Sequence, residues 1–265
     1  MTVTHTTLQK GLIGIVTKKI AIFDWDNTLI PTTQMFTNKS AINSAMTLKQ
    51  LESIGKMMYQ ILAKYISLYG AENMFIVTNA SSQKWIYFSL HCLNTIYKQK
   101  STSQKISEKR TYFEKISDLL LNQEISIYSA HQLYSERFPN QTTLWKSLVF
   151  TQIVTDRFIC DCDRLSSNDT TKYSILSIGD SMDEFNASLN AKNMLITTYK
   201  MNPNNILLHR IKLKYSPTMK EFKNEMKLIL SLARILNEEI SVSQTINYEK
   251  EYELFVESGS DLSDL

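Results

Sequence analysis

The chain has few of the residues that build disulfide frameworks, flexible linkers and membrane spans. Its three cysteines, an odd and sparse set in 265 residues, favour a reducing, cytoplasmic setting. Six glycines and four prolines leave little room for linkers between domains. No apolar run approaches the ~18 residues of a membrane-spanning helix, so we expect no membrane partner. With 43% hydrophobic and 21% charged residues, the composition is typical of a globular protein.

Charge is distributed unevenly along the chain. Residues 237–265 hold eight acidic residues and one lysine, a net charge of −7, so the body must carry +10 to give the overall +3. Such an imbalance points to an electrostatic partner or to a tail that folds back on the body. We expect one domain over 1–236 and an acidic tail over 237–265. Two alternatives stay open for the tail, a solvated appendage or intramolecular docking through Tyr252–Val256.

The most informative stretch is a short apolar run that ends in two aspartates. Ile20–Phe23 holds no polar residue, as in a strand buried on both faces of a parallel sheet. Because side chains alternate along a strand, Asp24 and Asp26 emerge on the same side at its C-terminal end, where open parallel sheets bind ligands. Two such carboxylates repel each other unless a cation or a shared proton intervenes. The pair predicts a metal site, and the simpler alternative is a turn shaped by Asn27 and Thr28.

Strand-like and helix-like segments alternate along the rest of the chain. This alternation predicts an α/β fold, with a Rossmann-like parallel sheet and helices on both of its faces. The expected strands after the first are 73–79, 125–128, 173–178, 194–198 and 211–215. The expected helices are 41–69, 85–97, 143–157 and one that follows Ser216-Pro217. The expected loops are 31–40 and 131–143, and 98–115 is expected to be a solvated loop or a solvated helix face.

The expected strand ends supply further polar groups that suit phosphate chemistry. The second strand ends in Thr78 and Asn79, the fourth runs into Asp180, and Lys146 lies near the start of a helix. A hydroxyl and an ammonium group suit phosphate oxygens, whereas carboxylates suit a hard cation such as Mg²⁺. Phosphoryl transfer requires these parts, and an aspartate can serve as its nucleophile. Taken singly, Thr78 can be a turn residue and Lys146 a surface lysine.

The order of these motifs resembles the haloacid dehalogenase (HAD) superfamily of phosphohydrolases. The series is Asp-x-Asp-x-Thr from Asp24, a strand ending in Thr78-Asn79, then Lys146, then Gly-Asp-Ser-x-x-Glu over 179–184. The match spans about Ile20–Thr198, and four motifs in the right order are far more specific than any one of them. The residues around the motifs look like those of a group of HAD-like proteins of plants and protists.

The resemblance implies a metal and two roles for the aspartates. Asp24 would be the nucleophile and a ligand of Mg²⁺, and Asp26 the general acid/base, with its backbone carbonyl also on the metal. Asp180 would ligate Mg²⁺, and Glu184, the second acidic residue of that motif, would also belong to the metal site, with Asp183 a weaker candidate for the same position. A second aspartate favours phosphatase chemistry over dehalogenation, which protonates no alcohol leaving group.

The resemblance also implies the substrate-binding residues. Thr78 and Lys146 would hold the transferring phosphoryl group, and Thr28 and Asn79 would lie beside it. The implied activity is hydrolysis of a phosphomonoester through an aspartyl-phosphate, and the implied partner is a phosphorylated substrate. Cap domains of this family enter after the first or the third strand, and both gaps are short here. We therefore expect little or no cap, a form that tends to accept bulky or macromolecular substrates.

Other functions stay open at this level. The chain could be a catalytically silent HAD scaffold that binds phosphorylated or anionic partners, although binding alone does not need an acid/base. A receiver-like phosphoacceptor domain also uses Asp, Thr and Lys, but the motif spacing favours the hydrolase. The basic segment 98–115 fits a solvated surface better than a nucleic-acid site, because no aromatic residues interleave with its charges. Cys160 and Cys162 lack the second pair that a structural zinc site requires.

Overall fold

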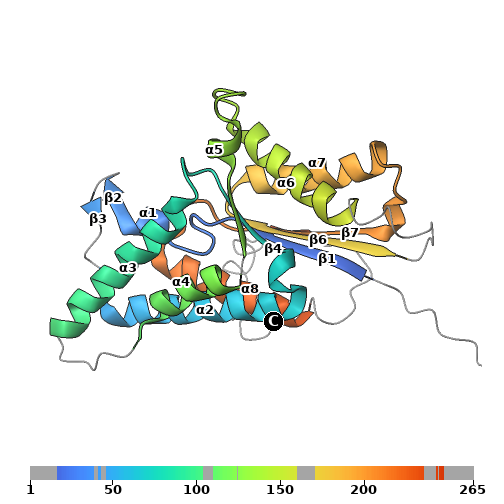
Figure 1. The fold of residues 1–265 in the computed structure, drawn as a ribbon. Coiled ribbons are helices and arrows are strands. Elements are labelled where there is room, and N and C mark those ends of the chain that lie inside the picture. Colours follow the sequence, from blue (N-terminus) through green and yellow to red (C-terminus); the bar gives the residue numbers. More distant parts are fainter. Residues whose placement is uncertain are drawn as a thin grey trace, which may run out of the picture.

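The protein is built on a six-stranded parallel sheet with the strand order β5-β4-β1-β6-β7-β8 (Figure 1). The computed structural model describes residues 17–38, 41–42, 46–103, 110–123, 125–159, 171–235, 243 and 245–247. The strands of the sheet are β1 (Thr17–Phe23), β4 (Met74–Thr78), β5 (Ser126–Ser129), β6 (Lys172–Gly179), β7 (Ile206–Lys212) and β8 (Thr245–Asn247). The predicted α/β fold with a parallel sheet is therefore confirmed.

Helices cover both faces of this sheet (Figure 1). On one face lie α2 (Leu48–Tyr69), α3 (Lys84–Ser103), α4 (Tyr112–Asn122) and α8 (Met219–Ile235). On the other lie α5 (Ala130–Tyr134), α6 (Thr142–Phe158) and α7 (Met182–Thr197). The remaining elements are α1 (Thr32–Met35), the hairpin of β2 (Phe36–Asn38) and β3 (Ala41–Ile42), and the short 3₁₀ helices at Ala71–Asn73 and Pro203–Asn205.

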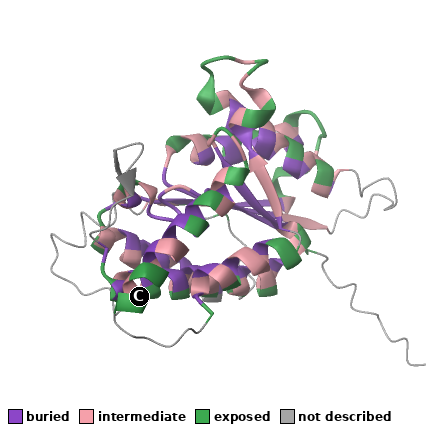
Figure 2. Ribbon diagram, turned by 60° about the vertical axis from the view of Figure 1, so that its left-hand side comes forward, coloured by how far each residue is buried: buried purple, intermediate pink, exposed green. Residues whose placement is uncertain are grey.

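The central strand divides the hydrophobic core into two parts. Ala21 and Phe23 pack among α2, α3, α4 and α8, whereas Ile20 and Ile22 pack against α6 and α7. This division follows from the alternation of side chains along a strand. Figure 2 shows the buried residues concentrated on the strands and on the helix surfaces turned toward them. The sheet thus holds β1 rigidly from both sides.

The strand register brings the ends of three strands to one edge of the sheet. Phe23, the last residue of β1, pairs with Ile76 of β4 and with Ile178 of β6. The backbone N–H of Asp24 then donates to the carbonyl of Ile178 at 2.9 Å. Residues that follow these three strands therefore gather around one point.

Of two strands predicted after the Asp180 motif, the first is wrong and the second is present with different bounds. Residues 194–198 lie at the end of α7, because Ala187, Ala191 and Leu195 are spaced four apart and form its buried face. The expected strand at 211–215 is instead β7, which begins at Ile206 and ends at Lys212. A short apolar run does not by itself distinguish a strand from the buried side of a helix.

Two expected loops contain regular structure, and the segment 98–115, expected to be a solvated loop or helix face, is helical at both ends. The segment 31–40 holds α1 and the strand β2, and 131–143 holds most of α5. Within 98–115, α3 continues to Ser103 and α4 begins at Tyr112. Thr111 caps α4 in a reciprocal pair of hydrogen bonds with Glu114, a capping box that the sequence pattern contains. The helix expected at 41–69 begins at Leu48, where Thr47 and Gln50 form the same kind of cap.

The gaps in which a cap domain would enter are small. Among the described residues, only α1, the β2–β3 hairpin and α2, followed by one 3₁₀ turn, separate β1 from β4. Between β5 and β6 the described part of the chain holds α5 and α6, and Cys160 and Cys162 lie outside it.

None of the described helices has the length and hydropathy to cross a membrane.

The sixth strand comes from the segment expected to be an acidic tail. Thr245–Asn247 pairs in parallel with Arg210–Lys212 at the edge of the sheet. Ser243 assists by accepting a hydrogen bond from the backbone N–H of Leu208 at 3.0 Å. Part of 237–265 therefore belongs to the sheet. Tyr252–Val256, the segment predicted to dock, lies outside the described residues.

Glu225 of α8 provides a test of the fold that is independent of any activity. Its side chain is 1% exposed, one carboxylate oxygen accepts from the N–H of Lys214 at 2.7 Å, and the other has no partner. Burial raises the pKa of Glu225 from an ordinary 4.5 to about 8. The folded protein therefore keeps a proton that the unfolded chain has lost, and stability at this position falls as pH rises from about 5 to 8.

We predict that Glu225→Gln raises the free energy of unfolding by about 1–3 kcal/mol at pH 9 and changes it little at pH 5. Urea unfolding at the two pH values measures this difference. The matched control is Glu221→Gln on the same helix, because the hydrogen bond from Lys214 lowers the pKa of Glu221 to about 2. That variant should gain no stability at either pH. An equal effect of Glu225→Gln at pH 5 and pH 9 would contradict the prediction.

Candidate active site

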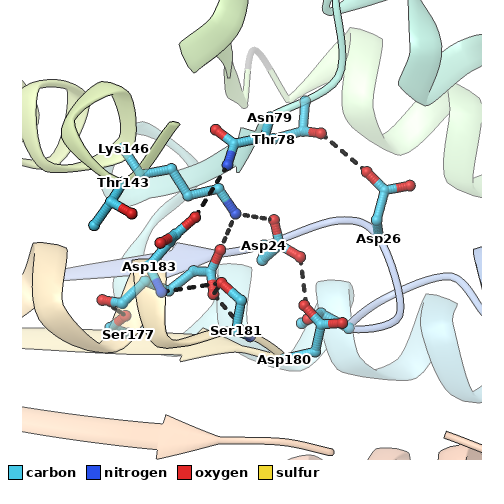
Figure 3. Close-up of polar contacts among 12 residues, drawn as sticks. Asp24, Asp26, Thr78, Asn79, Thr143, Lys146, Ser177, Asp180, Ser181 and Asp183 are labelled. Carbon is cyan, nitrogen blue, oxygen red and sulfur yellow. Dashed lines mark hydrogen bonds and ion pairs between the residues drawn. The ribbon is translucent and has the colours of Figure 1, made fainter. Parts of the chain in front are cut away.

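The strand ends at the middle of the sheet bring together most of the predicted site residues. Asp24 follows β1 directly, Thr78 ends β4, and Asp180 follows β6. Because β1 lies between β4 and β6, Asp24 has Thr78 on one side and Asp180 on the other (Figure 3). All three side chains are nearly inaccessible to solvent. The site therefore lies at the carboxyl edge of the parallel sheet, where the sequence places it.

Lys146 reaches the site from α6 and forms a buried ion cluster. Its Nζ lies 2.6 Å from Asp24 Oδ1 and also pairs with Glu184 Oε1 (Figure 3). All three side chains are at most 4% exposed. A buried ammonium group needs charged partners to offset its lost hydration, and here it has two. Lys146 is thus a member of the site, and the alternative of a surface lysine is wrong.

Thr28 completes the contacts of Asp24. Its hydroxyl donates to Asp24 Oδ2 at 3.3 Å, while Oδ1 faces Lys146. Thr28 is 1% exposed, and it is held there by the turn that follows β1. Asn27 occupies the left-handed region in this turn, with φ 54°, and its side-chain oxygen accepts from the N–H of Thr33 at 3.0 Å. The turn after β1 therefore helps to hold Thr28 against Asp24, so the turn and the carboxylate site are parts of the same local structure.

Glu184 is fixed by the start of α7. Its Oε2 accepts from the backbone N–H and the hydroxyl of Ser181, at 3.0 and 2.5 Å, and forms the capping box of this helix. Gly179 makes room for it, because a Cβ at this position would lie 2.5 Å from Glu184 Cγ. Both oxygens of Glu184 are thus engaged, one by Lys146 and one by Ser181. This geometry places Glu184 as the residue that orients Lys146.

Asp26 lies apart from this cluster and has its own partners. Thr78 donates its hydroxyl to Asp26 Oδ2 at 3.0 Å, and Trp85 donates its indole N–H to Oδ1 at 2.8 Å. Burial raises the pKa of Asp26, and the nearby charge of Asp24 raises it further, against the effect of these two hydrogen bonds. The two aspartates therefore have different surroundings: Asp24 faces a cation and Asp26 faces neutral donors.

Trp85 is a site residue that the sequence did not assign. It lies at the second position of α3, and its ring packs against Phe36 of β2 and Phe88, with centroids 5.4 and 5.7 Å apart. The hairpin after β1 and the helix after β4 thus support the indole that holds Asp26. The sequence does show an indole N–H donor seven residues after Thr78. Which group accepts its hydrogen bond depends on tertiary packing, so the pattern alone could not identify Asp26 as the acceptor.

Asp180 and Asn79 complete the site. Burial and the charge of Asp24 raise the pKa of Asp180 to about 7, and its backbone carbonyl accepts from Lys212 Nζ at 2.7 Å. Asn79 Nδ2 lies 3.5 Å from Asp183 Oδ2, and Asn79 Oδ1 is buried without a partner. Asp183 is therefore in contact with Asn79, a predicted substrate-binding residue, just as Glu184 is in contact with Lys146.

The donors present fit a hard cation. Asp24 and Asp180 repel each other across adjacent strand ends, and a cation between them would relieve the repulsion that raises the pKa of Asp180. In the described part of the chain, no three His, Cys, Asp or Glu side chains are grouped as a metal site. Of the predicted metal residues, Asp24, Asp180 and the backbone carbonyl of Asp26 would thus form, with water, an all-oxygen set of the kind that Mg²⁺ prefers. Glu184 was also predicted at the metal, but its two carboxylate oxygens are engaged by Lys146 and Ser181.

Comparisons of this chain with models of protein families, with curated proteins and with solved structures found no match. The function must be argued from the site.

The hydrogen bond from Trp85 gives the first prediction about this site. Trp85→Phe removes a donor that stabilises the Asp26 carboxylate, so we expect the pKa of Asp26 to rise by about one pH unit. Carbon NMR titration of protein labelled at its aspartate carboxyl groups measures this pKa. The control is Trp145→Phe, whose indole N–H donates to the carbonyl of Phe138 at 2.7 Å. An unchanged Asp26 titration in Trp85→Phe would show that the contact has no effect on the carboxylate.

Proposed function

We propose that this chain is a Mg²⁺-dependent phosphatase of the HAD superfamily, which hydrolyses a phosphomonoester through an aspartyl-phosphate on Asp24. The observation that carries the proposal is the different surroundings of its two aspartates. Asp24 is paired with a buried lysine, whereas Asp26 has a raised pKa and is held by Thr78 and Trp85. Pairs of carboxyl groups with such different environments characterise sites that divide nucleophilic and acid/base roles.

Asp24 supplies the nucleophile in the first step. One of its carboxylate oxygens attacks phosphorus, the bond from phosphorus to the leaving oxygen breaks, and Asp26 gives that oxygen a proton. The raised pKa of Asp26 favours this role, because the group keeps its proton at a higher pH than an ordinary aspartate. Lys146 offsets the negative charge on the phosphoryl oxygens, and Glu184 keeps it in place.

Asp26 reverses its role in the second step. Its carboxylate takes a proton from a water molecule, which attacks phosphorus and releases Asp24 and inorganic phosphate. Thr78 holds Asp26 in the free protein, and Thr28, Thr78 and Asn79 would donate to phosphoryl oxygens of the bound substrate. Asp24, Asp180 and the backbone carbonyl of Asp26 would hold Mg²⁺. When bound, the ion neutralises charge on the carboxylates and the phosphoryl group.

The segments after β1 and β5, where a cap domain would enter, are short. This observation favours a bulky substrate. In the described residues, the site has the β2–β3 hairpin beside it and no domain above it. A site closed by a cap domain restricts the size of its substrate, so an open one is compatible with a large phosphorylated group. The silent-scaffold alternative has no separate observation in its favour, since Asp26 and its two donors are all present.

The nucleophile gives the most direct test of this function. Asp24→Asn is nearly isosteric, so we expect an intact fold and a loss of at least ~10³-fold in Mg²⁺-dependent phosphate release from 4-nitrophenyl phosphate. Circular dichroism checks the fold. The control is Asp183→Asn, which removes a carboxylate next to the site but no proposed chemical role, and should lose less than about tenfold. Full turnover by folded Asp24→Asn would rule out the aspartyl-phosphate.

Asp26 is tested by the nature of the leaving group. If Asp26 donates the proton, Asp26→Asn should lower kcat for ethyl phosphate, a poor leaving group, by ~10²–10⁴-fold. 4-Nitrophenyl phosphate should be affected far less, because its leaving group needs no proton. Steady-state kinetics on the two esters gives the comparison. Equal losses on both would mean that Asp26 serves the backbone geometry of the site instead of the acid step.

A further inference from the structure

We propose that an apolar pocket beside Asp180 binds the leaving group of the substrate, and that this group carries an aromatic arm. The substrate class is thus a phosphomonoester of an arylalkyl type, in which a flat apolar ring lies several bonds away from the phosphorus. The proposal rests on the phosphatase function proposed above and specifies its substrate.

The pocket adjoins the catalytic site directly. It is a cavity of about 840 Å³, within the range of roughly 300–1,000 Å³ found for small-molecule sites. Asp180 forms one wall, one residue after the end of β6 and next to the strand that carries Asp24. From there the pocket extends over the ends of β7 and β8, on the side of the sheet that α7 covers. A ligand with its phosphoryl group at Asp24 therefore has this cavity beside it.

Three large apolar or aromatic side chains line the pocket among polar ones, and two of the three are exposed. Met182 and Tyr215 are 50% and 67% exposed, and both line the cavity together with Phe185. The guanidinium group of Arg210 packs on the Phe185 ring, with its carbon 3.9 Å from the ring centroid. Large apolar side chains grouped at the mouth of a cavity mark a binding surface. A methionine and two aromatic rings suit a flat, polarisable ring.

One polar group in the pocket has no partner. Asn247 Oδ1 is buried and accepts no hydrogen bond in the structure, although its residue lines the cavity. A buried amide oxygen without a donor is costly, and because this oxygen has almost no accessible surface, a ligand N–H or O–H would reach it only after the Asn247 side chain turns toward the cavity. Lys212, which also lines the cavity, directs its ammonium group to the carbonyls of Asp180 and Leu213. It shapes the wall and leaves the recognition to apolar contacts and Asn247.

The pocket also gives a role to the short sixth strand. Thr245 and Asn247 of β8 form its outer wall, far along the chain from the catalytic motifs. Without β8, the cavity would be open on that side, at the edge left by β7. The segment after α8 therefore contributes to substrate specificity and not to the chemical step.

The test compares two esters with the same kind of leaving oxygen. 3-Phenylpropyl phosphate and propyl phosphate both release a primary alcohol, so they differ in the ring alone. We expect the full-length protein with Mg²⁺ to favour the phenyl ester by about tenfold or more in kcat/KM. In Tyr215→Ala this preference should fall toward one, because the variant loses an aromatic contact with the phenyl ring. The control is Tyr199→Ala, an exposed tyrosine beyond the far end of α7, which should keep the preference.

A binding measurement separates this proposal from the phosphatase function. 3-Phenylpropylphosphonate and propylphosphonate are not hydrolysed, and calorimetry gives the affinity of each for wild type and Tyr215→Ala. If neither ester is turned over but the phenyl phosphonate binds about tenfold tighter in a manner that needs Tyr215, the pocket stands and the phosphatase function fails. Equal turnover and equal binding of the two members of each pair would overturn the pocket while leaving the phosphatase in place. A preference unchanged by Tyr215→Ala would overturn it as well.

Discussion

The structure of the site depends on one buried ion cluster, in which Lys146 lies between Asp24 and Glu184. The three residues come from α6, the end of β1 and the first turn of α7, so their pairing fixes two helices against the central strand. Removing one member of a buried charge pair typically costs about 3–5 kcal/mol, because the other is left without a partner. Gly179 leaves space for the Glu184 side chain, and Ser181 binds that side chain in the cap of α7, so both residues fix the position of Glu184. Fold and chemistry are thus constrained by the same contact.

The second aspartate of the site, Asp26, is held by neutral hydrogen-bond donors and not by an ion pair. Among the described residues, no cationic side chain lies at hydrogen-bond distance from Asp26, which accepts from two neutral donors, Thr78 at a strand end and the indole of Trp85. The hairpin after β1 supports that indole through Phe36. Segments on both sides of α2 in the chain therefore converge on one carboxyl group. The opposite side of the site, beyond Asp180, is shaped by β7 and β8 and by exposed apolar side chains. In the proposed enzyme, chemistry and substrate recognition would therefore occupy neighbouring strand ends.

The sequence predicted those features that depend on local pattern and strand ends. The apolar run before Asp24, the positions of Thr78 and Asp180, and the helix carrying Lys146 all follow from periodicity and the geometry of parallel sheets. It did not predict the contact of Trp85 with Asp26, because this contact joins residues 59 positions apart through packing. The strand expected at 194–198 was wrong because a helix buried on one side also shows a short apolar run. The strand β8 is too short to carry a pattern of its own.

The central claim is that Asp24 becomes phosphorylated during turnover. The most direct measurement is mass spectrometry of acid-quenched protein after mixing with Mg²⁺ and 4-nitrophenyl phosphate in the millisecond range. An aspartyl-phosphate survives acid for a short time and is cleaved by hydroxylamine. We predict one phosphoryl group on the peptide that contains Asp24, removed by hydroxylamine. Turnover without phosphate on that peptide, or with phosphate on another residue, would contradict the claim.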